Sequence, residues 1–337
     1  MKFPTIMKFP PMLGTLALVA CLLGLTDTAT PQAKPLKLRI GVHASIMGAP
    51  DVIAIRQGYF KQAGLDVEYR KFFLGKEGRD AMIAGAIDVN ATAPTPFLIG
   101  LAQGVPYTAV AVNSLICSAT HLVVLKSSDI NSVSQVRGKK VGLAKGTITE
   151  YVFMARIAPS YGLKPADFQV ANIPDPKDQI PSLIAKAIDM SSLGEPHTAI
   201  GEQDGTIRIV EDYCKYDPLP FMLTVTNKAI KDNPDAVVAY LRGWLRAVKF
   251  LKDEPQKAAA VYAEEQKSLG RDVSVAVVDK ALQRMKWEPD LTPQMEKYLV
   301  DQAKDLLSGA GEGRIATMPD IAKALNRDLL AKAKATR

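Results

Sequence analysis

The chain repeats a pattern of residues at a spacing of 101 positions. Residues 83–88 read Ile-Ala-Gly-Ala-Ile-Asp and residues 184–189 read Ile-Ala-Lys-Ala-Ile-Asp, while Gly41-Val42 and Gly142-Leu143 stand at the same spacing. Around these matches, short apolar segments alternate with amphipathic segments in the same order, which is typical of strands alternating with helices. The sequence therefore predicts an α/β protein with two lobes of similar build.

The expected elements follow this duplication. The first repeat has expected strands over 36–43, 65–70, 87–91 and 107–113, and helices over 50–63, 78–85 and 96–103. The second has expected strands over 139–144, 168–173 and 188–193, and helices over 149–161 and 179–187. After a strand over 221–226, we expect helices over 233–251, 255–268, 274–285, 292–308 and 319–334 that pack back onto lobe one. Ligands of open α/β sheets bind at the carboxyl ends of the strands, so facing lobes predict a cleft between them.

Residues 1–33 are predicted to be a secretory signal peptide outside the fold. Lys2 and Lys8 precede an apolar run from Met12 to Leu25, which is shorter than the roughly twenty residues needed to span a bilayer. Residues 18–21 read Leu-Val-Ala-Cys and resemble a bacterial lipobox, but the apolar run continues past Cys21. A soluble exported protein is therefore favoured over one anchored by a lipid at Cys21.

Two cysteines, Cys117 and Cys214, remain in the expected mature chain. An oxidising compartment permits them to pair as a disulfide. Free cysteines are also often buried, so two separate thiols are the alternative.

The formal net charge of +7 is no argument for an anionic partner. The expected signal peptide carries +1 and residues 321–337 carry +4, so the residues between them carry only +2. The short basic segment 137–140 lacks the interleaved aromatic residues of single-strand binders, and no nucleic-acid partner is expected.

Three turns between expected strands and helices, at 43–49, 92–95 and 145–149, are candidate anion sites. Helix N-termini present unpaired N–H groups and the positive end of the helix dipole. Thr147 and Glu150 have the spacing of a capping box, and plain capping is the alternative for each turn. No nucleophile elbow, Walker loop, dinucleotide fingerprint or Cys-x-x-Cys motif occurs, so we expect no enzyme activity and no cofactor.

His43 and His197 follow expected strands of different lobes, so both are expected to face the cleft. With Glu195 they have the ligand types of a zinc site, but their spacing has no metal signature. Contact with a ligand is therefore favoured, and no metal is predicted. His121 lies in an apolar strand and is interpreted as a core or edge residue.

Residues 57–68 read Gln-Gly-Tyr-Phe-Lys-Gln-Ala-Gly-Leu-Asp-Val-Glu. They resemble a recurring segment of the periplasmic solute-binding proteins of nitrate/taurine/sulfonate-type ABC importers. Segments 84–88, 136–142 and 145–147 add to this resemblance, which covers nearly the whole mature chain. It implies a type II periplasmic binding protein fold, with lobe one at 34–117 plus 215–337 and lobe two at 118–214.

The resemblance also implies closure of the lobes about two crossings, near 114–119 and 213–220. Cys117 and Cys214 fall at these crossings, where a disulfide would tie the hinge. Family ligand positions fall on Ser45, Lys76, Thr92, Thr95, Asn113, Lys145, Thr147 and Glu195, which join His43 and His197 as the candidate set.

One departure from the family pattern concerns residues 194–197. They read Gly-Glu-Pro-His where the family often carries an aromatic residue or Trp-Asp-Pro. A carboxylate at Glu195 would repel an anion unless a cation pairs with it. Alternatively, Glu195 accepts hydrogen bonds from an amine or hydroxyl group of the ligand.

The expected function is that of a periplasmic, monomeric binding protein for a small organic anion. The ligand classes are sulfonates, aromatic or other carboxylates, and nitrate, and the partner is the permease of an ABC importer. One alternative is a pyrimidine or thiamine-precursor binding protein, or the related thiamine-pyrimidine synthase, whose Cys-rich segment is absent here. A ligand-sensing periplasmic protein is the other alternative.

Overall fold

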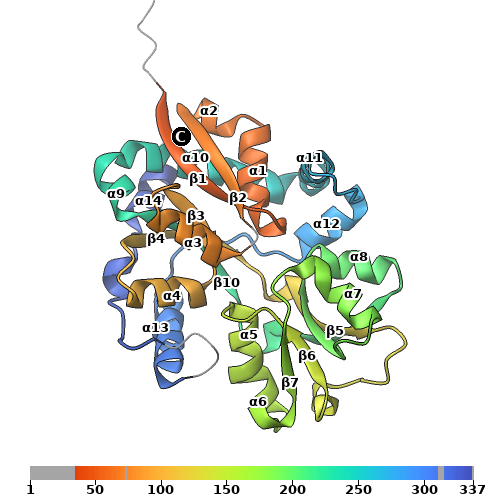
Figure 1. Ribbon diagram of the computed structural model, residues 1–337. Helices are drawn as coiled ribbons and strands as arrows, with labels where there is room; N and C mark the ends of the chain where they lie inside the picture. The colour runs from red at the N-terminus through yellow and green to blue at the C-terminus, as the bar shows by residue number, and fades with distance from the viewer. Residues whose placement is uncertain (1–34, 73, 310–314, 336–337) are drawn as a thin grey trace, which may run out of the picture. The chain divides into compact units, whose positions relative to one another are not determined.

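Figure 1 shows a computed structural model of the chain, which describes residues 35–72, 74–309 and 315–335. The expected signal peptide and Cys21 lie outside the described residues. Among the residues that are described, we find no helix with the length and apolar character needed to cross a membrane.

Two five-stranded mixed sheets form the centres of the two lobes (Figure 1). The sheet of lobe one has the order β2-β1-β3-β10-β4, from β1 (Leu36–His43), β2 (Leu65–Phe72), β3 (Val89–Thr92), β4 (Tyr107–Leu115) and β10 (Pro220–Thr226). The sheet of lobe two has the order β7-β6-β8-β5-β9, from β5 (Thr120–Leu125), β6 (Lys140–Leu143), β7 (Gln169–Asn172), β8 (Met190–Gly194) and β9 (Ile207–Asp212). The first three strands of each order are parallel, and β10 and β5 run antiparallel to both of their neighbours.

The two repeats exchange one strand. Strand β5 follows β4 along the chain, yet it lies in the sheet of lobe two between β8 and β9. Strand β10 follows β9 along the chain, yet it lies in the sheet of lobe one between β3 and β4. Each sheet is therefore completed by the last strand of the other repeat.

The chain crosses between the two sheets just before each exchanged strand, and the crossings are joined covalently. A disulfide links Cys117 to Cys214, which lie 97 residues apart in sequence. The backbone N–H of Ile116 also donates to the carbonyl of Leu219 at 3.0 Å. Of the two alternatives for these cysteines, the structure contains the disulfide.

Most helices occur close to the expected ranges, but the expected helix 319–334 is α-helical only from Asp328, and the helices His197–Gln203 and Asn227–Asp232 were not expected. Lobe one and the C-terminal part contain α1 (Ala49–Arg56), α2 (Tyr59–Gln62), α3 (Gly75–Ile83), α4 (Pro94–Ala102), α9 (Asn227–Asp232), α10 (Pro234–Asp253), α11 (Pro255–Ser268), α12 (Val275–Gln283), α13 (Pro293–Ser308) and α14 (Asp328–Ala335). Lobe two contains α5 (Ile148–Val152), a π-helical turn (Phe153–Ile157), α6 (Ala158–Ser160), α7 (Gln179–Ile184) and α8 (His197–Gln203). The expected helix 50–63 is split because Gly58 adopts a left-handed conformation with φ +68°.

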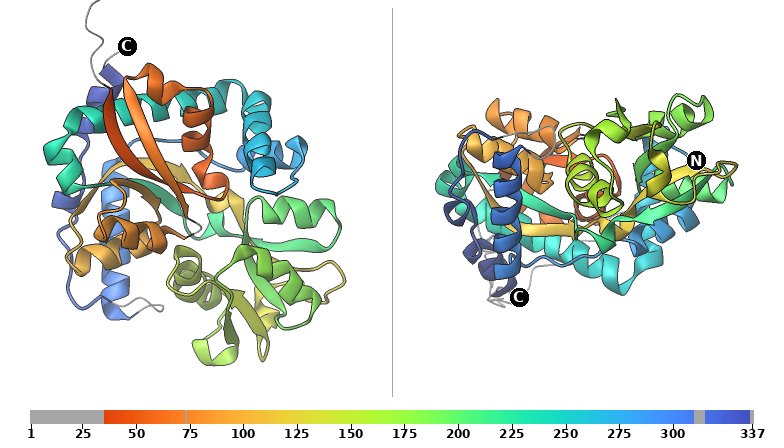
Figure 2. Two further views of the ribbon diagram at one scale, coloured as in Figure 1. Left: turned by 45° about the horizontal axis from the view of Figure 1, so that its top comes forward. Right: turned by 90° about the horizontal axis from the view of Figure 1, so that it is seen from below.

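The C-terminal helices pack mainly on lobe one, as expected (Figure 2). Helix α10 contacts α1, α2 and β1 and buries Val237, Leu241, Trp244, Val248 and Leu251, which are spaced three and four residues apart on one helix face. Helix α13 contacts α4. Helix α12 differs, because it contacts α8 of lobe two as well as α11.

Two glycines at matching positions of the sequence repeat make the same close packing contact in the two lobes. A Cβ atom on Gly41 would lie 2.7 Å from Cδ1 of Ile87, and one on Gly142 would lie 2.6 Å from Cδ1 of Ile188. The glycine and the isoleucine stand at matching positions of the two repeats. The same close contact inside each lobe therefore explains why these letters coincide.

Candidate functional site

A cavity of about 530 Å³ lies between the lobes at the carboxyl ends of their strands. Lobe one contributes the turn after β1 and the start of α3, and lobe two contributes the turns after β6, β7 and β8. The volume falls within the usual range for small-molecule sites. This is the position that the topology of two facing α/β lobes predicts.

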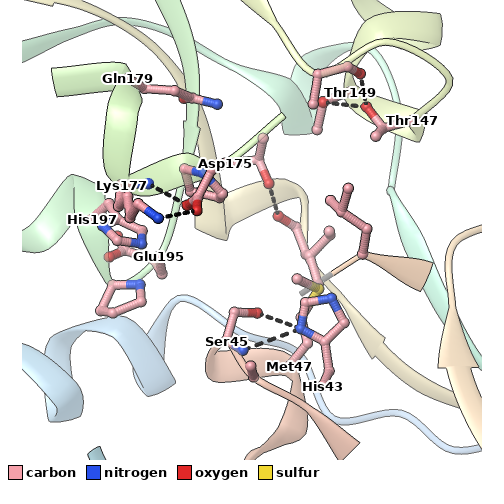
Figure 3. A pocket seen from close by; sticks show the side chains of 18 of the residues that line it. His43, Ser45, Met47, Thr147, Thr149, Asp175, Lys177, Gln179, Glu195 and His197 are labelled. Atoms are coloured by element: carbon pink, nitrogen blue, oxygen red, sulfur yellow. Dashed lines mark hydrogen bonds and ion pairs between the residues drawn. The ribbon is translucent and has the colours of Figure 1, made fainter. Parts of the chain in front are cut away.

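Six of the ten candidate residues line the cavity: His43, Ser45, Lys76, Thr147, Glu195 and His197. Figure 3 shows most of them around the opening, with the lobe-one residues facing those of lobe two. The other four candidates, Thr92, Thr95, Asn113 and Lys145, are not among the residues that line it.

For each of the four candidates that do not line the cavity, the structure shows which contact holds the residue elsewhere. Asn113 lies on β4, which the exchanged strand β10 displaces to the edge of the sheet; its Nδ2 donates to the carbonyl of Met47 at 2.9 Å. Thr95 accepts a hydrogen bond from Gln302 of α13 at 2.7 Å. Thr92 is covered by the start of α3, since a Cβ on Gly75 would lie 2.4 Å from its Oγ1.

Lys145 is the fourth excluded candidate. Its backbone N–H donates to Oδ1 of Asn172 at 3.1 Å, which fixes the turn after β6. Its neighbours Ala144 and Gly146 line the cavity instead.

The two cavity histidines are neutral hydrogen-bonding groups. Burial lowers the pKa of His43 to about 4. Burial lowers the pKa of His197 as well, and the positive charge of Arg271 adds to this effect. The backbone N–H of Ser45 donates to Nδ1 of His43 at 3.2 Å, so the neutral ring carries its proton on Nε2 (Figure 3).

Glu195 is paired with a cation behind the cavity wall. Its Oε2 accepts from the backbone N–H of Ala199 at 3.0 Å, and its Oε1 accepts from Nη1 of Arg284. Burial raises the pKa of Glu195, and the hydrogen bond and charge of Arg284 act in the opposite direction. Glu195 was expected either to be paired with a cation or to accept hydrogen bonds from the ligand. The structure favours the first interpretation, because Arg284 neutralises the charge of the carboxylate.

Thr147 and Glu150 form part of the expected capping box at the start of α5. Oγ1 of Thr147 accepts from the backbone N–H of Glu150 at 3.5 Å. The Glu150 carboxylate accepts from the N–H of Gly146 at 2.9 Å rather than from that of Thr147. The turn is therefore held by its own side chains at the edge of the cavity.

Several lining residues were not in the candidate set. Met47 and Thr149 lie within the candidate turns 43–49 and 145–149, whereas Asp175, Lys177, Gln179 and Arg271 were missed altogether. The repeat held a signal for one of them, because Lys177 stands 101 residues after Lys76. Lys177 pairs with Asp175 at 2.7 Å (Figure 3). Gln179 accepts from Ser191 through Oε1 at 3.0 Å, which leaves its Nε2 donor for the cavity. Arg271 comes from the C-terminal part and has no local motif.

Apolar side chains complete the wall of the cavity, chiefly Met47, Leu74, Ile116, Ile148, Phe221 and Val273. Phe221 packs its ring edge-to-face with that of His43, with centroids 5.3 Å apart. Within the ranges that the structure describes, no group of three or more metal-ligand side chains comes together.

Known proteins share both sequence and fold with this chain. A model of the NMT1-like family matches residues 31–264. A putative aliphatic sulfonates-binding protein of Bacillus subtilis (strain 168) is 25% identical over 279 residues, which cover 80% of this chain and 81% of that protein. A 4-amino-5-hydroxymethyl-2-methylpyrimidine phosphate synthase of Saccharomyces cerevisiae (strain ATCC 204508 / S288c) is 25% identical over 243 residues, 67% of this chain and 69% of that protein.

Among solved structures, the alkanesulfonate-binding protein SsuA from Xanthomonas axonopodis pv. citri bound to MOPS superposes with a TM-score of 0.76. Its sequence identity is 19%, and the match covers 88% of this chain and 100% of that chain. This likeness confirms the expected two-lobed α/β fold.

Proposed function

The chain belongs to the NMT1-like family, and from this membership we propose that it is an exported solute-binding protein for a small organic anion. It acts as a monomer in the periplasm, after removal of its signal peptide, and delivers the ligand to the permease of an ABC importer. The sulfonate-binding relatives support this ligand class. The proposed lobes are 34–117 plus 215–337 and 118–214.

The observation that carries the proposal is a cavity lined by polar, hydrogen-bonding side chains from both lobes. His43 and Ser45 belong to lobe one, and Thr147, Thr149 and His197 belong to lobe two. A ligand that binds both sets gains its full hydrogen bonding only when the lobes close on it. Closure also removes water from the site, which strengthens each of these interactions.

The charges around the cavity suit an anion with an apolar body. Lys76 and Lys177 are exposed at its edge, one from each repeat. Asp175 compensates the charge of Lys177, whereas the charge of Lys76 attracts anions over a distance. Glu195 does not oppose them, because Arg284 neutralises it. The apolar wall then holds the remainder of the molecule, as in most small-molecule sites.

A thermal-shift screen of the mature protein tests the proposal. The panel contains alkanesulfonates, arenesulfonates, aromatic carboxylates, nitrate, pyrimidines and divalent cations. A ligand at one hundred times its Kd stabilises the folded state by about 2.7 kcal/mol. Ser45→Ala should reduce this shift, whereas Ser134→Ala, a change outside the residues that line the cavity, should leave it intact. Stabilisation by divalent cations alone would refute the proposal.

Pyrimidines are the second ligand class to test, because one relative is a pyrimidine phosphate synthase. The two cysteines of the expected mature chain are paired with each other, so neither offers a free thiol. Mass spectrometry of the incubation mixture separates the two functions. A bound pyrimidine that is recovered unchanged indicates binding, and one that is consumed indicates an enzyme.

A further inference from the structure

The cavity has a buried carboxylate in its wall, which is unexpected for an anion site. The side chain of Glu195 has no exposed surface. Its two oxygens are engaged by Ala199 and Arg284, which hold the carboxylate in place. In an environment of low dielectric constant, an uncompensated negative charge there would act strongly on an anion in the neighbouring cavity.

Arg284 reaches this carboxylate from another part of the chain. It directly follows α12, which contacts α8 of lobe two. Its Nη1 binds Glu195, and its Nη2 binds Glu202 at 2.8 Å. Arg284 is not among the residues that line the cavity, so it acts from behind the wall.

Lys280 completes a cluster of four charges. Its Nζ lies 2.9 Å from the Glu202 carboxylate, one helical turn before Arg284. The four-charge cluster of Glu195, Glu202, Lys280 and Arg284 has no net charge. Its members differ in exposure: the Arg284 side chain is 20% exposed and the Lys280 side chain is 49% exposed. Solvent therefore screens Lys280 more than Arg284.

We propose that Arg284 is a specificity-determining residue that admits anions to the cavity by cancelling the charge of Glu195. This inference rests on the proposed function. Loss of the Arg284 charge leaves the cluster with one net negative charge, and loss of the Glu195 charge leaves it with one net positive charge. The two changes break the same ion pair and yet alter anion affinity in opposite directions.

Isothermal titration with benzenesulfonate tests this prediction, and benzylammonium serves as a probe of similar size and opposite charge. Arg284→Met should weaken benzenesulfonate binding on the order of tenfold, and Glu195→Gln should strengthen it by a similar factor, as expected for one charge near a partly buried site. Gln retains one of the two carboxylate oxygens, which can still accept from the backbone N–H of Ala199, and replaces the oxygen that accepts from Arg284 with an uncharged amide NH₂ group. Benzylammonium should respond in the reverse sense. Lys280→Met, the matched change at the exposed cation, should alter either affinity less than threefold.

The possible outcomes separate this inference from the proposed function. Weakening of benzenesulfonate binding in both variants would indicate a purely structural ion pair and would overturn the inference alone. If Arg284→Met does not fold, Glu195→Gln decides, since an affinity that does not rise overturns the inference. Failure of the wild-type protein to bind benzenesulfonate or any other anion of the panel would refute the proposed function and the inference together.

Discussion

Removing the Cys117–Cys214 disulfide should lower the free energy of unfolding by an amount that depends on the length of chain between the two cysteines. Cys117 and Cys214 stand 97 positions apart, and the segment between them contains all five strands of the lobe-two sheet. In the chain-entropy model, a cross-link that closes a loop of about 100 residues lowers the conformational entropy of the unfolded chain. This loss raises the free energy of the unfolded state by about 4.7 kcal/mol at 25 °C. Native disulfides commonly contribute somewhat less, so we expect Cys117→Ser with Cys214→Ser to lower the free energy of unfolding by about 3–5 kcal/mol.

Urea unfolding with two probes measures this effect. Circular dichroism reports on both lobes, while the fluorescence of Trp244 and Trp287, both buried, reports on the C-terminal part. Coincident transitions establish two-state unfolding and license the comparison of free energies. The wild-type protein with a reductant should match the double serine variant. Ser118→Ala, next to Cys214 with Oγ 2.9 Å from Sγ, is the control and should have little effect.

A decrease of less than about 1 kcal/mol in the free energy of unfolding would refute the reasoning. It would mean that the disulfide restricts the unfolded chain far less than the model requires. A large loss in the serine variant that a reductant does not reproduce would assign the effect to the substitutions themselves. A change confined to the slope of the urea transition would point to the compactness of the unfolded state.

Three further predictions use urea unfolding. Gly142→Ala should cost about 1–3 kcal/mol by crowding Ile188, and Ile188→Val in the same chain should restore most of it. Burial raises the pKa of Asp51 to about 7, so the folded state retains a proton that the unfolded state releases near pH 4. Wild-type stability should therefore fall from pH 4 to pH 7 relative to Asp51→Asn, and equal slopes would contradict this. Arg156→Met should cost about 1–3 kcal/mol, because buried Asp217 loses a cation 3.3 Å away; no loss would argue against the pair.

The duplication accounts for what could be predicted from the sequence. It indicated two α/β lobes and the turns that carry His43, Ser45, Thr147 and His197 into the cavity. Local patterns also located most helices, because amphipathic spacing and proline positions are properties of short segments.

Long-range pairing accounts for most of what was missed. Asn113 was expected in the cleft because it falls at a ligand position of the family that the chain resembles, but it lies on β4, which β10 from the other repeat separates from β3. Arg271 and Arg284 lie in the segments just after α11 and α12, which have no counterpart in the repeat, so no spacing or motif identifies them. Lys177 is different, since its match to Lys76 was visible in the sequence and was not used.

The exchanged strands have a consequence for how the chain can be divided. A break in the segment between β5 and β6, at residues 126–139, yields two fragments that each hold one full repeat of five strands. Neither fragment can complete a sheet alone, since each sheet takes its antiparallel strand from the other. The fragments should therefore gain structure only when mixed, and the Cys117–Cys214 bond would then join them covalently. Two separate genes for the halves would encode an obligate heterodimer held together by reciprocal strand exchange.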